Sequence, residues 1–232
     1  MGTGLLQIGP GRRTLLIVAA PAEAGAVLAG LGRPGETPSV WTLTPVNERF
    51  DLVLSGVGKA NAAGAVARTL DPRRHGAAIN LGVAGSLPGP CPPSIGGLVV
   101  ATASILADDG VATPDGFITQ AMLGFPPADP PGMDFPGDAE LLHALRDAGG
   151  ALSRVATVST CSGTDALALE VACRTGAVAE AMEGAAAALV AHRLGVPFGE
   201  VRAISNTTGD RQSQQWDLHA ALDTLRTLAV RL

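Results

Sequence analysis

Two segments in the last third of the chain carry the residue types that could do chemistry. Glu183 begins a nearly all-alanine segment, and farther along an apolar run ends in Arg202, Ser205 and Asn206. Alanines let a helix pack closely on a sheet without adding polar atoms, and charged groups beside such a core are costly unless something needs them. Taken singly, the segments equally fit a helix-capping glutamate and a solvated strand end. Their order favours a ligand site, because open α/β sheets bind ligands at helix starts and strand ends.

A second carboxylate, Glu23, follows the first apolar run of the chain at 15–20. At the carboxyl end of a strand, such a group can act as a general base. A solvated glutamate at a helix start has the same appearance in sequence, so both interpretations stay open.

Other kinds of catalytic site find little support. The Gly-x-Gly turn at 56–58 is not a dinucleotide fingerprint, because Asn61 replaces the third glycine and no acidic residue follows about 20 residues on. Lys59 is the one lysine, and its place in this tight turn disfavours Schiff-base chemistry. Three cysteines without a Cys-x-x-Cys pair and four scattered histidines predict neither a disulfide framework nor a metal site. We therefore expect no metal and no cofactor.

Short β-rich runs alternate with helical ones, which is typical of a sheet covered on both faces. We expect strands at 15–20, 40–43, 51–55, 77–81, 98–104, 155–160 and 201–205, and helices at 60–70, 139–148, 165–173, 184–194 and 217–230. No linker separates two cores, so we predict a single domain over residues 1–232, with 1–13 as a flexible N-terminal extension.

The segment 108–137 is unlike the rest of the chain. It contains six prolines and three of the five phenylalanines, at 117, 125 and 135. Long Pro-rich loops are usually functional or disordered. We expect a loop that seals a hydrophobic edge, forms a ligand wall or makes a dimer contact.

Composition narrows the class of protein. The chain has 232 residues, 47% of them hydrophobic, which is ample for a sizeable core. A net charge of −5 without a basic stripe argues against nucleic acid. No apolar stretch approaches the roughly 20 residues that a membrane span needs. The cysteine pattern favours a reducing cytoplasm.

Four motifs together resemble the purine nucleoside phosphorylase and methylthioadenosine nucleosidase superfamily. They read Met-Glu-Gly-Ala-Ala at 182–186, Arg-Ala-Ile-Ser-Asn at 202–206, Gly-Val-Gly-Lys-Ala-Asn-Ala-Ala at 56–63 and Asn-Leu-Gly-Val-Ala-Gly-Ser-Leu at 80–87. Each motif alone is weak, but four in the right order are specific, and the matched stretches run from about residue 15 to 206. The resemblance implies a three-layer α/β/α sandwich with a central twisted mixed sheet, acting as a homodimer or higher homo-oligomer on a small-molecule nucleoside.

The resemblance also implies roles for individual residues. Glu183 would accept hydrogen bonds from the ribose 2′- and 3′-hydroxyls, and Met182 would form an apolar platform under the sugar or simply fill the core. Glu23 would activate water, with Arg202 and Ser205 around that water. The strand residues that would line the substrate are Gly82, Val83 and Ala84.

On the base side, Asn206 replaces the aspartate of methylthioadenosine nucleosidases. An asparagine N–H can satisfy the acceptor at position 6 of a 6-oxopurine but cannot act as a general acid; Asp210 is an alternative proton donor. Ser162, Gly163 and Thr164 fit the family's Ser-Gly-Asp loop, with threonine in place of aspartate. Phe117 would line the pocket for the 5′ group. Arg211 would bind a substrate carboxylate there, or else stay exposed or pair with a nearby aspartate.

A finer resemblance is to the futalosine hydrolases, carried by Asn206, by Thr-Thr-Gly-Asp-Arg at 207–211 with Trp216, and by the segment 107–117. It implies hydrolysis of futalosine to hypoxanthine and dehypoxanthine futalosine in menaquinone biosynthesis. The alternatives are a methylthioadenosine/S-adenosylhomocysteine nucleosidase, a purine nucleoside phosphorylase and a catalytically silent nucleoside-binding protein.

Overall fold

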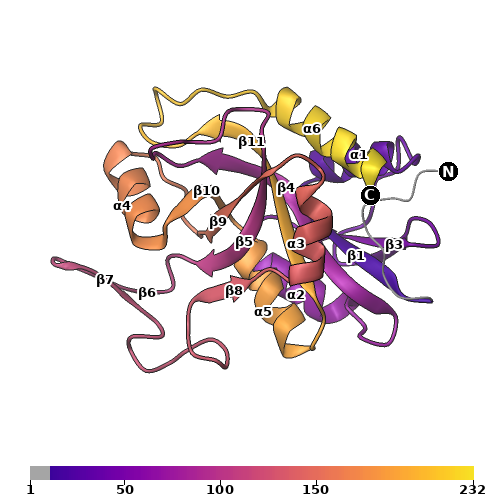
Figure 1. The fold of residues 1–232 in the computed structure, drawn as a ribbon, viewed down its shortest axis with the longest axis horizontal. Helices are drawn as coiled ribbons and strands as arrows, with labels where there is room; N and C mark the ends of the chain where they lie inside the picture. Colours follow the sequence, from indigo (N-terminus) through magenta and orange to yellow (C-terminus); the bar gives the residue numbers. More distant parts are fainter. Residues whose placement is uncertain (1–10) are drawn as a thin grey trace.

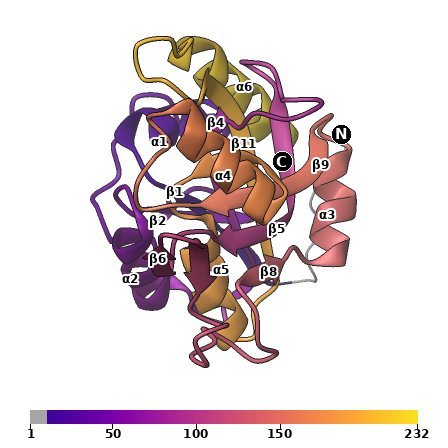
Figure 2. The same ribbon diagram turned by 90° about the vertical axis from the view of Figure 1, so that its left-hand side faces the viewer.

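A mixed β-sheet runs through the centre of the molecule, and helices cover both of its faces (Figures 1 and 2). The computed structural model describes residues 11–232. In this range, nine strands form the main sheet in the order β10-β9-β5-β11-β4-β1-β3-β2 with β8 paired to β5, while β6 and β7 form a separate hairpin. The strands are β1 (Arg13–Val18), β2 (Leu43–Pro45), β3 (Phe50–Leu54), β4 (His75–Ser86), β5 (Leu98–Leu106), β6 (Gly110–Thr113), β7 (Gly116–Thr119), β8 (Asp134–Pro136), β9 (Ala151–Thr157), β10 (Ala177–Ala181) and β11 (Phe198–Thr207).

Four of the six helices in the described residues pack in pairs, with α1 beside α6 and α2 beside α5, whereas α3 and α4 pack on strands (Figure 1). They are α1 (Pro21–Gly30), α2 (Lys59–Thr69), α3 (Ala139–Arg146), α4 (Asp165–Thr175), α5 (Gly184–Arg193) and α6 (Leu218–Arg231). Between residues 11 and 232, none is long and apolar enough to cross a membrane.

The central strand β1 shows how the two helical layers are held. Leu16 and Val18 join a buried cluster with Leu28 of α1 and residues of α6. Leu15 and Ile17 join another with the alanines of α2 and α5. Successive side chains of a strand point to opposite faces, so an apolar run without alternation buries both. The predicted three-layer α/β/α architecture is confirmed.

One edge of the sheet gathers the ends of several strands. β1 pairs in parallel with β3 and β4, and β4 pairs in parallel with β11. The short strand β10 runs antiparallel to the last residues of β4. The loops and helix starts that follow these strands therefore converge at one place, where open α/β sheets bind their ligands.

Several elements differ from the prediction. Helix α1 was not expected, since Ala20 provides no capping side chain and the helix lacks a clear polar face. Strand β10 was missed because three of its five residues are alanines, which strands disfavour. The segment 108–137 is not a plain loop, because it contains β6, β7 and β8. The strands expected at 40–43 and 155–160 lie instead at Leu43–Pro45 and Ala151–Thr157.

The first strand begins earlier than expected. Residues 1–10 of the predicted flexible extension lie outside the described residues. Arg13 belongs to β1, and its guanidinium lies 2.8 Å from the carboxylate of Asp51. Arg13 is thus part of the sheet rather than of an extension.

Candidate active site

Glu183 lies just before α5 with 4% of its surface exposed. Its Oε1 accepts a hydrogen bond of 2.9 Å from the backbone N–H of Gly58, so the turn at 56–58 is tied to the start of α5. Its Oε2 lies 3.3 Å from both the Met182 nitrogen and Arg202 Nη1. A carboxylate has about four acceptor positions, and contacts of 3.3 Å are long for hydrogen bonds. Glu183 is therefore held in place and keeps an acceptor position for a ligand hydroxyl.

Arg202 is fully buried and holds the surrounding polar groups. Its Nε donates to Glu200 over 2.7 Å, Nη1 faces Glu183, and Nη2 donates to Asn80. Burial alone would lower the pKa of Arg202, but the carboxylates of Glu200, Glu183 and Glu23 outweigh it and raise that pKa above its ordinary value. The rigid guanidinium fork therefore stays charged and fixes several partners at once.

Glu23 lies in the first turn of α1 and is also 4% exposed. Its Oε2 accepts from the backbone of Ala19 and Ala20 at 3.1 and 2.8 Å, and its Oε1 accepts from Val83 at 2.8 Å. Burial raises the pKa of Glu23, and the Val83 N–H and the Arg202 charge offset this only in part. A carboxylate with a raised pKa and one free acceptor position on Oε1 is suited to general-base chemistry.

Two glycines allow these charged groups to approach the backbone. A Cβ at Gly82 would lie 2.5 Å from Arg202 Nη1 and 2.8 Å from Glu23 Oε1. A Cβ at Gly184 would lie 2.2 Å from both carboxylate oxygens of Glu200. Gly82 of the motif at 80–87 and Gly184 of the motif at 182–186 are therefore needed because a side chain at either position would collide with a charged group.

The buried cluster has an excess of negative charge. Three carboxylates, Glu23, Glu183 and Glu200, surround one guanidinium, Arg202. Charges in a water-excluded site interact more strongly than in water. When ionised, the cluster is therefore suited to stabilise positive charge that develops on a bound ligand.

A cavity of about 280 Å³ lies near the carboxyl ends of β4 and β11, beyond the charge cluster. It is lined by Gly85, Cys161, Ser162, Gly163, Glu180, Asn206, Arg211, Gln214 and Trp216. Asn206 donates from Nδ2 to the Thr207 carbonyl at 2.8 Å and accepts from the Ser205 hydroxyl at 2.8 Å. A carbonyl can only accept, so these bonds set the orientation of the amide. The second N–H of Nδ2 remains for a ligand.

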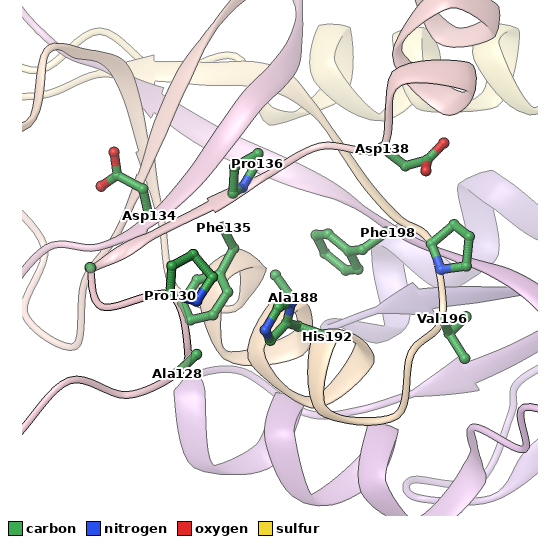
Figure 3. Close-up of a pocket in the computed structure, with 12 residues that line it drawn as sticks. Ala128, Pro130, Asp134, Phe135, Pro136, Asp138, Ala188, His192, Val196 and Phe198 are labelled. Carbon is green, nitrogen blue, oxygen red and sulfur yellow. The ribbon is translucent and has the colours of Figure 1, made fainter.

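Another cavity, of about 220 Å³, lies toward the far end of α5, where Phe135, His192 and Phe198 gather (Figure 3). The carboxylates of Asp134 and Asp138 point away from this apolar group (Figure 3). Asp138 caps α3 and Asp134 forms a surface ion pair, so neither is available for chemistry.

A third cavity, of about 520 Å³, lies between α4 and the Pro-rich segment after β4, with Cys91 and Cys173 in its wall. It is the largest of the three but is lined almost wholly by apolar residues and contains no carboxylate. The largest cavity is therefore not the best candidate for the active site. The buried charge cluster and the cavity at Asn206 together form the candidate active site.

Comparison with known proteins shows the family to which the chain belongs. Residues 16–232 match the model of the phosphorylase superfamily. The chain belongs to this superfamily. It is similar to the futalosine hydrolase of Acidothermus cellulolyticus, with 40% identity over 92% of this chain and 87% of the relative. It is also similar to the futalosine hydrolase of Streptomyces coelicolor, with 37% identity over 91% of each chain. At these identities the chain is a member of the same family as these relatives.

Solved structures of the superfamily share the fold. The 5′-methylthioadenosine/S-adenosylhomocysteine nucleosidase of Neisseria meningitidis has a TM-score of 0.75 and 21% identity, covering 95% of this chain and 97% of that one. The futalosine hydrolase of Helicobacter pylori strain 26695 has a TM-score of 0.72 and 17% identity, covering 95% and 94%. At such identities the likeness is one of fold.

In this superfamily member, most of the predicted site residues lie together. Those linked within the charge cluster are Glu23, Gly82, Val83, Met182, Glu183 and Arg202. Ser205 connects them to the cavity, since its hydroxyl contacts both the Ala84 carbonyl and the Asn206 amide. The cavity itself is lined by Ser162, Gly163, Asn206 and Arg211.

Two predicted residues lie elsewhere. Thr164 is exposed and caps α4, accepting from the Leu167 N–H at 3.2 Å. Phe117 lies on β7, where its ring packs 4.2 Å from the Arg174 guanidinium. Neither lines the cavity at Asn206, so their substrate contacts stay predictions.

Arg211 lines the cavity at Asn206. It donates to Gln214 at 2.9 Å and lies 4.9 Å from the centre of the Trp216 ring. Its role toward a substrate carboxylate stays a prediction. Asp210, the alternative proton donor, is exposed and does not line the cavity.

Sequence reasoning missed Glu180, which is 4% exposed and lines the cavity beside Ser162. A signal was present, because Glu180 is the only polar residue in the apolar run at 177–181. The run was not recognised as a strand, so its carboxylate was not placed at the site.

Proposed function

We propose that this protein is a nucleosidase that hydrolyses the N-glycosidic bond of futalosine, releasing hypoxanthine and dehypoxanthine futalosine in menaquinone biosynthesis. The observation that carries the proposal is an identity of 36–40% to three curated futalosine hydrolases, over 79–92% of this chain. The chemistry of the site supports it in three places.

The first is the ribose. Cleavage of an N-glycosidic bond passes through an oxocarbenium-like sugar, and the site must stabilise that cation more than the substrate. Glu183 has an acceptor position for a ribose hydroxyl, and such bonds strengthen as positive charge grows on the ring. The excess negative charge of the cluster acts in the same direction.

The second is the nucleophile. Glu23 would take a proton from water while the water oxygen bonds to the anomeric carbon and the bond to the base nitrogen breaks. The bonding electrons leave with the base, which takes up a proton from solvent, and Glu23 releases its proton to solvent afterwards. Glu23 has one acceptor position for this water on Oε1, beside the Val83 N–H, and its raised pKa makes it a stronger base than an exposed glutamate.

The third is the leaving base. Asn206 has no proton to transfer, but the free N–H of its amide can donate to an oxygen of the departing purine. This favours a 6-oxopurine such as hypoxanthine over adenine, whose amino group is a donor at the same position.

Water is favoured over phosphate as nucleophile. The resemblance implies that phosphorylases of this superfamily bind phosphate at the turn corresponding to 56–58, with added arginines. Here the Gly58 N–H is taken by Glu183. The nearby Arg202 is fully buried and already donates to Glu200 and Asn80.

For assembly and location we propose a homo-oligomer in the cytoplasm. The β6–β7 hairpin extends away from the body of the molecule (Figure 1), and apolar side chains are exposed just beyond it at Met122, Leu123 and Phe125. Such a surface fits contact with a second copy. The free cysteines are exposed, which fits a reducing compartment.

A nucleoside panel tests the proposal. Purified protein is incubated with futalosine, inosine and methylthioadenosine, and the released bases are separated by chromatography. We expect efficient release of hypoxanthine from futalosine only. Preferred cleavage of methylthioadenosine would replace the proposal with the nucleosidase alternative, and no cleavage of any of them would favour a binding protein.

A further inference from the structure

Glu180 lies on the opposite side of Gly85 from Asn206. Strand pairing sets Gly85 of β4 against Asn206 of β11 on one side and against Glu180 of β10 on the other. Residues paired in this way present their side chains on the same face of a sheet. All three residues line the same cavity. A Cβ at Gly85 would lie 2.7 Å from Thr208 Cγ2 and 3.1 Å from Asn206 Nδ2, so the glycine lets the Asn206 amide lie close to this strand.

The surroundings of Glu180 show which hydrogen-bonding role it has. The Ser162 backbone N–H donates to Oε1 at 2.7 Å, and the Ser162 hydroxyl donates to Oε2 at 2.6 Å. Two donors directed at the two oxygens fit an ionised carboxylate, which only accepts. Burial raises the pKa of Glu180 above its ordinary value, the Ser162 donors offset this only in part, and the negative charge of Asp108 adds to the rise. Further acceptor positions of the carboxylate remain for a donor on a ligand.

A 6-oxopurine presents the complementary edge, with a donor at N1–H next to an acceptor at O6. Adenine presents the reverse, an acceptor at N1 and a donor at the 6-amino group. In a site that offers a carboxylate and an amide N–H, adenine would place its N1 acceptor against the carboxylate and its amino donor against the N–H. Polar groups left unpaired in a buried site are costly.

We propose that Glu180 is a base-recognition residue that accepts a hydrogen bond from N1–H of a 6-oxopurine while Asn206 donates to O6. The proposal rests on the proposed function, because it assumes that the cavity at Asn206 receives the base. It assigns the choice between 6-oxo and 6-amino purines to two side chains rather than to Asn206 alone.

Free bases test the pair without any 5′ group. Binding of hypoxanthine, adenine and 1-methylhypoxanthine to the wild-type protein is measured by calorimetry. We expect hypoxanthine to bind at least tenfold more tightly than either of the others, since 1-methylhypoxanthine keeps O6 but lacks N1–H. Equal affinity for hypoxanthine and 1-methylhypoxanthine would overturn the role of Glu180, and this comparison needs no variant.

The substitution Glu180→Gln tests the same contact from the protein side. We expect hypoxanthine affinity to fall by roughly ten- to a hundredfold, while adenine affinity stays the same or rises, because the glutamine amide can donate to N1 of adenine. The matched control is Glu170→Gln, at an exposed glutamate of α4, which should change neither. Equal losses for both bases in Glu180→Gln would mean that Glu180 merely supports the loop at Ser162, and would overturn the proposal.

The two proposals fail separately. If futalosine is not cleaved but hypoxanthine selectivity is found and depends on Glu180, the proposed function is wrong and base recognition stands. If futalosine is cleaved but the selectivity is absent or insensitive to Glu180, base recognition is wrong and the proposed function stands.

Discussion

At the residue scale, the buried Glu23 predicts an unusual pH dependence. A general base must be ionised to accept a proton. Burial raises the pKa of Glu23 above its ordinary value of 4.5, and the negative charge of Glu183 adds to the rise. The positive charge of Arg202 opposes this rise without cancelling it. As the pH is lowered, kcat/KM should therefore begin to fall at a higher pH than it would if the general base were an exposed glutamate. Glu23→Gln should abolish turnover, and the exposed Glu140→Gln should leave the profile unchanged. A profile flat down to pH 4.5 in the wild type would contradict the role.

Glu183 supports a second prediction at this scale. Glu183→Gln should lower kcat by roughly two to four orders of magnitude, because the amide lacks the charge that stabilises the ribosyl cation. Far-ultraviolet circular dichroism and the melting temperature serve as folding controls. A loss of less than tenfold in a folded variant would remove Glu183 from the ribose site.

The residues that the sequence made predictable are those in motifs. Glu183 and Arg202 were proposed from their order along the chain, and the structure joins them at 3.3 Å. Glu23 was proposed at the end of the first strand, and its three backbone donors explain why it is buried rather than solvated. Glu180 stood out as the polar residue of an apolar run, but its place beside Asn206 could not be predicted, because it depends on pairing between strands far apart in the chain.

At the scale of elements, the packing of β4 against α1 and β11 can be tested through one glycine. A methyl group at Gly82 would lie 2.5 Å from Arg202 Nη1 and 2.8 Å from Glu23 Oε1. Gly82→Ala should therefore displace both groups and lower kcat/KM at least a hundredfold. Gly25→Ala is the matched control, because a Cβ at Gly25 meets nothing within 4 Å and alanine favours a helix. Near-normal activity of Gly82→Ala would show that the close approach is not needed.

Element prediction succeeded where the local sequence signal was strong and failed where it was weak. The strands around β1 and the helix at α5 were located within a few residues, because long apolar or alanine runs define them. Helix α1 and strand β10 depend on tertiary packing rather than on local signals, and each of them brings a carboxylate to the site. The missed elements thus account for the parts of the site that were uncertain.

At the scale of the whole molecule, the sheet is stabilised by a cluster of charged side chains around Asp51. This cluster lies near the amino ends of β1, β3 and β4, away from the candidate active site. Asp51 is fully buried and contacts Arg13, Arg74 and His75 at 2.8, 2.6 and 3.1 Å. Burial alone would raise the pKa of Asp51, but its bonds to Arg74, Arg13 and His75 lower it below its ordinary value of 3.8.

Asp51→Asn should therefore lower the free energy of unfolding at pH 7 by about 3 kcal/mol without changing kcat at 25 °C. Because the folded-state pKa is lowered, the contribution is complete at pH 7 and is lost only as the pH falls below 3.8 toward the folded pKa. Urea unfolding over this pH range measures the difference, with Asp223→Asn on the surface of α6 as the control. A constant difference down to pH 2 would contradict the argument.

The central claim, that this site transfers water to the sugar of futalosine, is tested most directly by an isotope measurement. Futalosine is incubated with the wild-type protein in phosphate-free buffer made with ¹⁸O-water, and the products are analysed by mass spectrometry. We predict one hypoxanthine released for each dehypoxanthine futalosine formed, with one ¹⁸O atom in the sugar product, at a rate that added phosphate does not change. Formation of a sugar 1-phosphate that requires added phosphate, or failure to release hypoxanthine at all, would contradict the account.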